Sequence, residues 1–311
     1  MESKFLIISP QAGFGNRLRA LCSCILIAKE TNRKPYHVWT PVDCNQLTES
    51  TCATMMQPYM RMQLRGWDSY FIQNDDFPLA TSDLFPTIDK IISEWGPNDY
   101  WYSIQSNGQL KWLSTNSEIP LIISKHVVDI ATDDSRCILI ETSLLSHLKP
   151  IFLEHYIDEN KLIDIFKEYF IPKAKYSQFI SEVTDIDVGI SIRRGEFLDY
   201  FPEARQSYND IIDWVLSISK HSSKMVIFSD DHEFRDILVA DVISKFHGEK
   251  TIVTLDFTNF EQWEVAFLEF LILSEKCNKI YGTPSSSFAQ IASLFRGKRH
   301  YSEILSCPQF S

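Results

Sequence analysis

Two adjacent arginines stand at the end of an apolar stretch, in the sequence Ser191-Ile192-Arg193-Arg194-Gly195-Glu196. Charged groups in such a place are costly unless they have partners. A guanidinium group can bind two oxygens of a phosphate or a carboxylate at once. Because side chains alternate along an extended segment, we expect Arg193 and Arg194 on opposite faces. One arginine would then contact an anionic ligand while the other braces the turn; a salt bridge between neighbouring strands is the alternative.

A glycine-containing turn follows the apolar run near the N-terminus. It consists of Gly13-Phe14-Gly15-Asn16-Arg17 and precedes a segment with helical periodicity. Gly13 and Gly15 permit a tight turn and the close approach of a ligand, and the start of a helix offers N–H donors to an anion. Glycines in such turns are often only structural, but a turn by itself requires neither Asn16 nor Arg17.

Two further segments carry polar groups where an apolar stretch ends. Phe228-Ser229-Asp230-Asp231 offers two carboxylates, although Ser229 or Asp231 could simply cap the next helix. The segment 282–288 contains three serines, whose hydroxyl and backbone donors at the start of a helix suit a diphosphate. These serines are Ser285, Ser286 and Ser287.

A regular alternation of strands and helices must position these segments in the second half of the chain. Apolar runs predict strands at residues 187–193, 224–229, 250–255 and 279–282. Helical spacing of apolar residues predicts helices at 208–216, 233–245, 263–271 and 288–295. Because no hairpin turn interrupts this alternation, we expect a parallel sheet covered by helices on both faces. Such sheets bind ligands at the carboxyl ends of their strands.

The first half of the chain is less regular. Apolar patterns predict strands at 5–9 and 136–141, a helix that begins near Phe14, and a helix at 157–170. Residues 40–120 show little periodicity. The pattern breaks between residues 171 and 187, so we place the boundary there and expect two domains, 1–178 and 179–311.

The composition excludes some classes of protein. The chain has 311 residues and a formal net charge of −11, so a broad basic surface for nucleic acid is not expected. No apolar run approaches the roughly 18 residues needed to span a bilayer, and the N-terminal residues do not have the layout of a signal peptide. We therefore expect a soluble, cytoplasmic protein.

Taken together, these segments resemble the fucosyltransferase superfamily, which includes α1,2-, α1,6- and protein O-fucosyltransferases and uses GDP-fucose. The resemblance is carried by the segments 13–17, 190–196, 228–231, 269–277 and 285–288. It implies an α/β protein with the GT-B fold, in which two Rossmann-like domains face a cleft. The first domain would be the acceptor side, and the second would bind the GDP-sugar.

The resemblance also implies roles for individual residues. Arg193 would bind the β-phosphate and offset the charge on the departing GDP, and Arg194 would hold the loop or share that task. Glu269 would pair with the guanine base. The other residues implied in donor binding are Gly13, Gly15, Asn16, Arg17, Asp230, Ser285, Ser286 and Ser287. Three positions depart from the family pattern: Ser191 replaces a histidine, and Glu196 and Glu269 replace aspartates.

These features favour an inverting, metal-independent glycosyltransferase that transfers a sugar, with L-fucose from GDP-fucose as the expected donor, to a hydroxyl of a glycan acceptor. Arginine rather than a metal ion would stabilise the leaving group. A carboxylate would accept the proton of the acceptor hydroxyl. The candidates for this base, all just after the arginines, are Glu196, Asp199 and Glu203.

Two alternatives have different chemistry. A metal-dependent GT-A glycosyltransferase would use Asp185-Ile186-Asp187 as its metal-binding motif, but this motif precedes an apolar strand instead of following one. No histidine or cysteine cluster has metal-ligand spacing, so no metal cofactor is expected. A non-catalytic relative that binds a GDP-sugar or a glycan would keep Arg193 and the serine turn and lack turnover.

Overall fold

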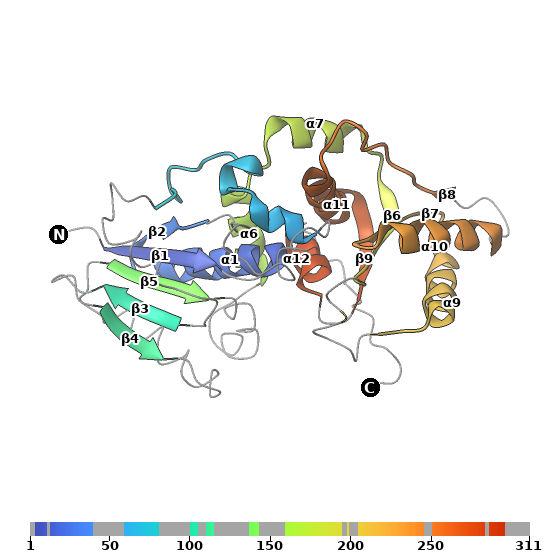
Figure 1. Ribbon diagram of the computed structural model, residues 1–311. Coiled ribbons are helices and arrows are strands. Elements are labelled where there is room, and N and C mark those ends of the chain that lie inside the picture. The colour runs from blue at the N-terminus through green and yellow to red at the C-terminus, as the bar shows by residue number, and fades with distance from the viewer. Residues whose placement is uncertain are drawn as a thin grey trace. The chain divides into compact units, whose positions relative to one another are not determined.

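The computed structural model describes residues 4–10, 13–39, 59–80, 100–104, 110–114, 137–142, 159–194, 198, 205–245, 251–283 and 286–295 (Figure 1). The chain divides into two compact units. The first unit comprises Met1–Pro41 and Arg65–Lys173, and the second comprises Val42–Leu64 and Ala174–Ser311. A segment from the first half of the chain, Val42–Leu64, therefore belongs to the second unit. The expected single boundary between residues 178 and 179 does not include this exchange.

The first unit contains a five-stranded mixed sheet with the order β2-β1-β5-β3-β4. β1 (Phe5–Pro10) lies between β2 (Lys34–His37) and β5 (Cys137–Thr142) and is parallel to both. β3 (Tyr100–Ile104) and β4 (Leu110–Ser114) form an antiparallel extension beyond β5. The strands expected near residues 5–9 and 136–141 are confirmed, whereas the sequence did not predict the antiparallel pair.

The described part of the first unit includes two α-helices. α1 (Phe14–Glu30) contacts β1 and β2, and α6 (Glu159–Tyr169) contacts α1. The apolar residues that predicted α1 are all buried. They are Phe14, Leu18, Leu21, Cys22, Ile25 and Leu26. An aromatic cluster at the short 3-10 helix η3 (Trp67–Ser69) encloses His37, whose ring centroid lies 4.7 Å from those of Trp67 and Phe77.

The second unit contains a four-stranded sheet with the order β8-β7-β6-β9, and every neighbouring pair is parallel. The strands are β6 (Ile186–Ile192), β7 (Lys224–Ser229), β8 (Thr251–Ile252) and β9 (Cys277–Gly282). This confirms the expected parallel sheet, although β8 is shorter than the apolar run at 250–255 indicated.

Helices cover both faces of this sheet (Figure 1). Val188, Ile190 and Ile192 of β6 share a buried apolar cluster with α9 (Tyr208–Ser219) and α10 (His232–Lys245). The alternate residue, Gly189, faces away from that cluster. It approaches the side chains of α11 (Gln262–Lys276) and β9, and α12 (Ser287–Phe295) packs against α11 and β9. Alternate residues of β6 therefore contact the helices on opposite faces of the sheet.

Two glycines allow the helices to pack closely on this sheet. A Cβ atom at Gly189 would lie 2.6 Å from both the Sγ of Cys277 and the Cδ2 of Leu273. A Cβ atom at Gly282 would lie 2.5 Å from the Cβ of Ala289 on α12. A side chain at either position would force neighbouring atoms to shift.

The stretch after residue 173, expected as a boundary, contains a further helix, α7 (Ala174–Glu182), which packs on α11. Its Tyr176 hydroxyl and Lys175 ammonium both donate hydrogen bonds to Glu264 of α11, and the ring of Tyr176 contacts Phe267. The 3-10 helix η2 (Met60–Leu64) also packs on α11. The second unit consists of two segments that are separate in sequence, and an element of each segment, η2 in one and α7 in the other, packs on α11. Within the described part of the chain, every helix is too short or too polar to cross a bilayer.

Candidate functional site

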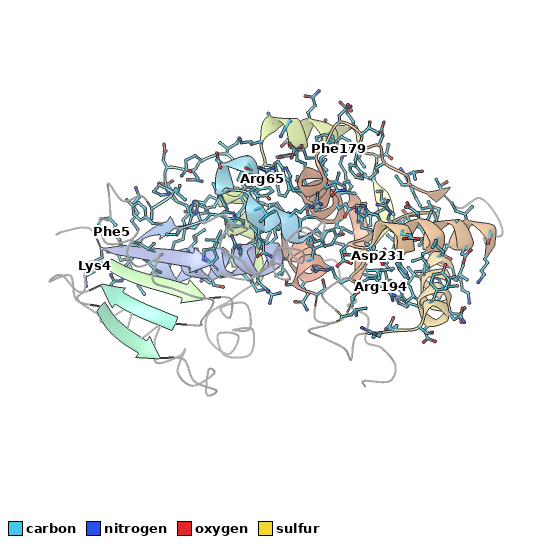
Figure 2. All side chains as sticks on the ribbon, in the orientation of Figure 1. Lys4, Phe5, Arg65, Phe179, Arg194 and Asp231 are labelled. Atoms are coloured by element: carbon cyan, nitrogen blue, oxygen red, sulfur yellow. The ribbon has the colours of Figure 1, made fainter. Side chains whose placement is uncertain are left out.

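Three strands of the second unit end at the same edge of the sheet. The pairing of Ile192 with Ser229, and of Ser191 with Gly282, aligns the carboxyl ends of β6, β7 and β9. The next residues along the chain are Arg193, Asp230 and Thr283. Parallel pairing thus brings together residues that lie up to 90 positions apart in sequence. Figure 2 labels Arg194 and Asp231, which follow β6 and β7 at this edge.

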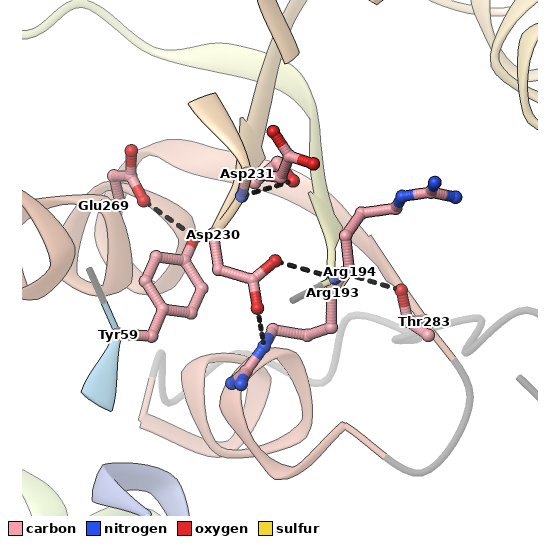
Figure 3. Close-up of polar contacts among 8 residues, drawn as sticks. Tyr59, Arg193, Arg194, Asp230, Asp231, Glu269 and Thr283 are labelled. Atoms are coloured by element: carbon pink, nitrogen blue, oxygen red, sulfur yellow. Dashed lines mark hydrogen bonds and ion pairs between the residues drawn. The ribbon is translucent and has the colours of Figure 1, made fainter. Parts of the chain in front are cut away.

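Asp230 binds both arginines at this edge (Figure 3). Its Oδ2 accepts a hydrogen bond from the Nε of Arg193 at 2.8 Å, and its Oδ1 accepts one from the backbone N–H of Arg194 at 2.7 Å. The Oγ1 of Thr283 accepts a further bond from the backbone N–H of Arg193 at 2.8 Å. Only 1% of the Asp230 side chain is exposed, and 13% of that of Arg193. The salt bridge between strand ends that the sequence left as an alternative is therefore present, and it involves the Nε–H of the guanidinium.

The two arginine side chains point in opposite directions, as the alternation predicted (Figure 3). The guanidinium carbon of Arg193 lies 5.1 Å from the ring centroid of Tyr59. That of Arg194 lies 4.4 Å from the ring centroid of Phe234, on α10. Arg194 is therefore stacked on the helix layer that packs on the other face of the sheet, where it can brace the turn.

Asp231 caps α10. Its Oδ1 accepts a hydrogen bond from the backbone N–H of Phe234 at 3.0 Å, and the Oγ of Ser229 accepts one from the N–H of Asp231 at 3.2 Å. A carboxylate that binds a free N–H group in the first turn stabilises the start of a helix. The capping interpretation is confirmed for Asp231, so the two aspartates of this segment have separate roles.

Glu269 is a fully buried carboxyl group on α11, with an exposed fraction of 0%. Its Oε2 accepts a hydrogen bond from the hydroxyl of Tyr59 at 2.7 Å, and its Oε1 lies 3.8 Å from the Nη1 of Arg235. Among the described residues, this Oε1 has no hydrogen-bond partner. Burial raises the pKa of Glu269 to about 8; the Tyr59 hydrogen bond and Arg235 counteract this, while Asp230 adds to it. The group therefore binds a proton readily near neutral pH.

Tyr59, Thr283 and Arg235 contact the predicted residues, although the sequence motifs gave none of the three a role. Thr283 was detectable, since it directly follows a predicted strand. Tyr59 had no local signal, because it lies in the weakly patterned stretch 40–120 and reaches the site through the fold. Burial and the nearby Glu269 carboxyl hold the pKa of Tyr59 well above its usual value, so its hydroxyl keeps its proton.

The serine turn leads from β9 into α12. The backbone N–H of Ser286 donates to the carbonyl oxygen of Thr283 at 3.1 Å, and Ser287 begins the helix. Ser286 is 2% exposed, and its Oγ has no hydrogen-bond partner among the described residues. A buried hydroxyl of this kind is available to donate to a ligand at the start of α12. Ser285 lies outside the described residues.

The glycine turn belongs to the first unit. Gly13 precedes α1 with extended backbone angles (φ −65°, ψ 163°), and no described atom lies within 4 Å of the position of a Cβ atom there. Gly15, Asn16 and Arg17 lie in the first turns of α1. Arg17 is 4% exposed, and its guanidinium carbon lies 5.2 Å from the ring centroid of Trp39. Burial lowers the pKa of Arg17 to about 10.

The candidate bases Glu196, Asp199 and Glu203 lie outside the described residues. Asp187 of the alternative metal motif stands at the start of β6, where its Oδ2 accepts hydrogen bonds from the N–H and hydroxyl of Ser223 and the N–H of Lys224. These bonds lower the pKa of Asp187. They tie β6 to β7 at the edge of the sheet opposite Arg193. Among the residues that the structure describes, no three His, Cys, Asp or Glu side chains gather to hold a metal ion.

The sequence matches no known protein family profile and no curated protein. Solved structures do match. NodZ α-1,6-fucosyltransferase soaked with GDP-fucose has a TM-score of 0.54 at 14% identity, covering 94% of this chain and 92% of its own; NodZ from Bradyrhizobium gives 0.53. A mutant of Arabidopsis thaliana FUT1 in complex with GDP gives a TM-score of 0.58 at 14% identity, covering 95% of this chain and 69% of its own. The chain has the fold of the fucosyltransferases.

A third fucosyltransferase, POFUT1 in complex with GDP-fucose, gives a TM-score of 0.50 at 11% identity and covers 98% of this chain and 96% of its own. The likeness between this chain and the fucosyltransferases therefore extends along nearly its whole length. Because the identities are low, this likeness concerns the fold. It confirms, for the fold, the resemblance that the sequence motifs carry.

Proposed function

We propose that this protein is a glycosyltransferase of the fucosyltransferase superfamily, with the GT-B arrangement of two Rossmann-like domains and GDP-fucose as donor. The observation that carries the proposal is the setting of Arg193. It stands at the carboxyl end of a parallel strand, oriented by Asp230 and Thr283, in a fold whose solved examples include complexes with GDP-fucose and GDP.

In the proposed reaction, an acceptor hydroxyl attacks the anomeric carbon of fucose from the face opposite GDP, which inverts the configuration. The bond between that carbon and the β-phosphate oxygen breaks, and negative charge develops on the phosphate. Arg193 offsets this charge without a metal ion. Asp230 acts through Arg193, because its salt bridge fixes the guanidinium before the donor binds. Glu196, Asp199 and Glu203 remain the candidates to take the proton of the attacking hydroxyl.

The other proposed contacts follow from the start of α12 and from Glu269. The buried Oγ of Ser286, with Ser285 and Ser287, would donate hydrogen bonds to the diphosphate. Glu269 would accept from the N1–H and 2-amino groups of guanine, using the oxygen that lacks a partner among the described residues. From the first unit, the turn of Gly13, Gly15, Asn16 and Arg17 would contribute to binding of the sugar and phosphates.

A nucleotide panel tests the donor class. We expect GDP to raise the melting temperature, and UDP, ADP and CMP to leave it nearly unchanged, because a ligand that binds only the folded state stabilises it. Equal shifts with all four nucleotides would contradict a base-specific site. Turnover of GDP-fucose in the absence of an acceptor would count against the non-catalytic alternative.

Arg193 variants test the mechanism. We expect Arg193→Ala to lower the rate of GDP-fucose hydrolysis by about 10²–10³-fold, the usual loss for one preorganised electrostatic group. Arg193→Lys should recover only part of the rate, since lysine keeps the charge but loses the fork. Lys279→Ala, which removes an exposed cation from β9, is the matched control and should behave as the parent.

The outcome also separates the proposed role from a purely structural salt bridge. A structural bridge predicts a lower melting temperature for Arg193→Ala with near-normal turnover by the protein that stays folded. The proposed mechanism predicts activity in the presence of EDTA. Loss of activity on chelation, restored by Mn²⁺, would refute the metal-independent mechanism and favour the metal-dependent alternative.

A further inference from the structure

Tyr59 contacts two residues of the candidate donor site at once (Figure 3). Its hydroxyl donates to the Oε2 of Glu269 at 2.7 Å, and its ring centroid lies 5.1 Å from the guanidinium carbon of Arg193. The ring also stacks on Phe288 of α12, with centroids 4.4 Å apart and planes 19° from parallel. Only 3% of Tyr59 is exposed. One side chain therefore touches the strand end, α11 and α12.

Buried residues of η2 and Phe288 of α12 hold Tyr59 in place. It directly precedes η2, which packs on α11, and Met62 and Gln63 of η2 are 0% and 3% exposed. Phe288, on which its ring stacks, makes an edge contact with Phe270 of α11 at 5.5 Å. A ring fixed in this way loses little further freedom when it contacts a charged group.

The contacts of Tyr59 complement those of Asp230. Asp230 binds the Nε–H of Arg193 and so fixes one edge of the guanidinium, while the aromatic ring attracts the cation through its face. The hydroxyl binds the Glu269 oxygen that faces it, and leaves the other oxygen to Arg235 and a ligand. One residue, Tyr59, thus contacts both Arg193 and Glu269, which have roles in donor binding in the proposed function.

We propose that Tyr59 is a positioning residue of the donor site, which holds Arg193 through its ring and Glu269 through its hydroxyl. The inference rests on the proposed function. The two parts of the side chain have different effects. The ring positions Arg193, which stabilises the leaving group, and the hydroxyl affects the protonation of Glu269, which binds the guanine base.

The charged groups around Glu269 define the expected pH effect of the hydroxyl. The groups that face it are Tyr59, Arg235 from α10 and Asp230 after β7. The Tyr59 hydrogen bond lowers the pKa of Glu269, so its loss raises that pKa further. If ionised Glu269 binds guanine, GDP binding should then require a higher pH.

The experiment compares Tyr59→Phe, Tyr59→Leu and the control Tyr208→Phe. Tyr208 donates to Asp241 at 2.7 Å, so the control removes a tyrosine–carboxylate bond of the same length elsewhere in the second unit. GDP affinity is measured by calorimetry between pH 6 and 9, and kcat and KM are measured for GDP-fucose hydrolysis. Tyr59→Phe should keep kcat within about threefold and move the midpoint of GDP binding to higher pH. Tyr59→Leu should lose about tenfold or more in kcat, and the control should match the parent.

The results separate failure of this inference from failure of the proposed function. A parent protein that binds no GDP refutes the proposed function. A parent that binds GDP, with a folded Tyr59→Leu variant equal to it in kcat, refutes the positioning role. Tighter GDP binding by Tyr59→Leu also refutes it, because the ring would then compete with the donor. Should Tyr59→Leu fail to fold, an unchanged pH midpoint in Tyr59→Phe refutes the role of the hydroxyl.

Discussion

The buried carboxyl of Glu269 makes the stability of the protein depend on pH. We consider the substitution Glu269→Gln, which keeps the shape and an oxygen that can accept from Tyr59 but cannot ionise. The folded protein holds the Glu269 proton up to a pKa of about 8, whereas the unfolded chain releases it near 4.5. The folded state therefore binds more protons between these values. Stability from this group is complete below pH 4.5 and is lost as the pH rises to about 8.

The size of the effect follows from the two pKa values. Between pH 5 and pH 9, the shift is worth about 4 kcal/mol at 1.36 kcal/mol per pKa unit. Because Glu269 is fully buried, solvent screening does not reduce this figure. Glutamine does not ionise. The free energy of unfolding of Glu269→Gln should therefore rise by about 4 kcal/mol relative to that of the parent when the pH increases from 5 to 9.

Urea unfolding of parent and variant at pH 5, 7 and 9, followed by tryptophan fluorescence, measures this difference directly. Glu264→Gln, on the same helix, is the matched control. Burial raises the pKa of Glu264, but hydrogen bonds from Lys175, Glu261 and Tyr176 outweigh this and lower it overall. The folded pKa of Glu264 lies below its unfolded value of 4.5, so the contribution of this group is nearly complete at pH 5. The stability difference between the control and the parent should therefore stay nearly constant from pH 5 to pH 9. A difference between parent and Glu269→Gln that stays constant within about 1 kcal/mol would refute the reasoning.

Two other predictions concern stability. His37 is fully buried, and burial lowers its pKa to about 3, so the unfolded chain binds more protons below pH 6.5 and stability falls with falling pH. This should cost about 3 kcal/mol between pH 7 and pH 4, and His37→Phe should remove that dependence in urea unfolding; an identical pH dependence would contradict it. Gly189→Ala should lower the free energy of unfolding by about 1–3 kcal/mol, because its Cβ would overlap Leu273 and Cys277. An unchanged urea midpoint would show that these side chains move aside without cost.

Local patterns in the sequence predicted the second unit well. The limits of β7 at residues 224 and 229, the start of α12 near Phe288 and the cap formed by Asp231 all depend on neighbours in the chain. Alternation along β6 likewise predicted that Arg193 and Arg194 point apart. Such features are local, so a single sequence contains them.

Features that depend on distant partners were not predictable in the same way. β3 pairs with β5, which comes much later in the chain, so that Trp101 lies opposite Ile140. Its other partner, β4, is close in sequence, but the stretch that contains both strands shows no clear alternation. α7 occupies a stretch that looked like a boundary because Pro172 interrupts the preceding helical pattern. The hydrogen-bond donor to buried Glu269 is Tyr59, which lies 210 positions earlier. Periodicity within a helix cannot reveal such a partner.

The discontinuity of the second unit has a consequence for synthesis of the protein. The segment Val42–Leu64 leaves the ribosome long before α11, the helix on which η2 packs. Until α11 has been translated, Met62 and Tyr59 lack the surface that buries them, and the nascent chain exposes apolar side chains that attract chaperones. For the same reason, a fragment that begins at Ala174 would emerge without Tyr59, and its Glu269 would have no tyrosine hydroxyl to bind.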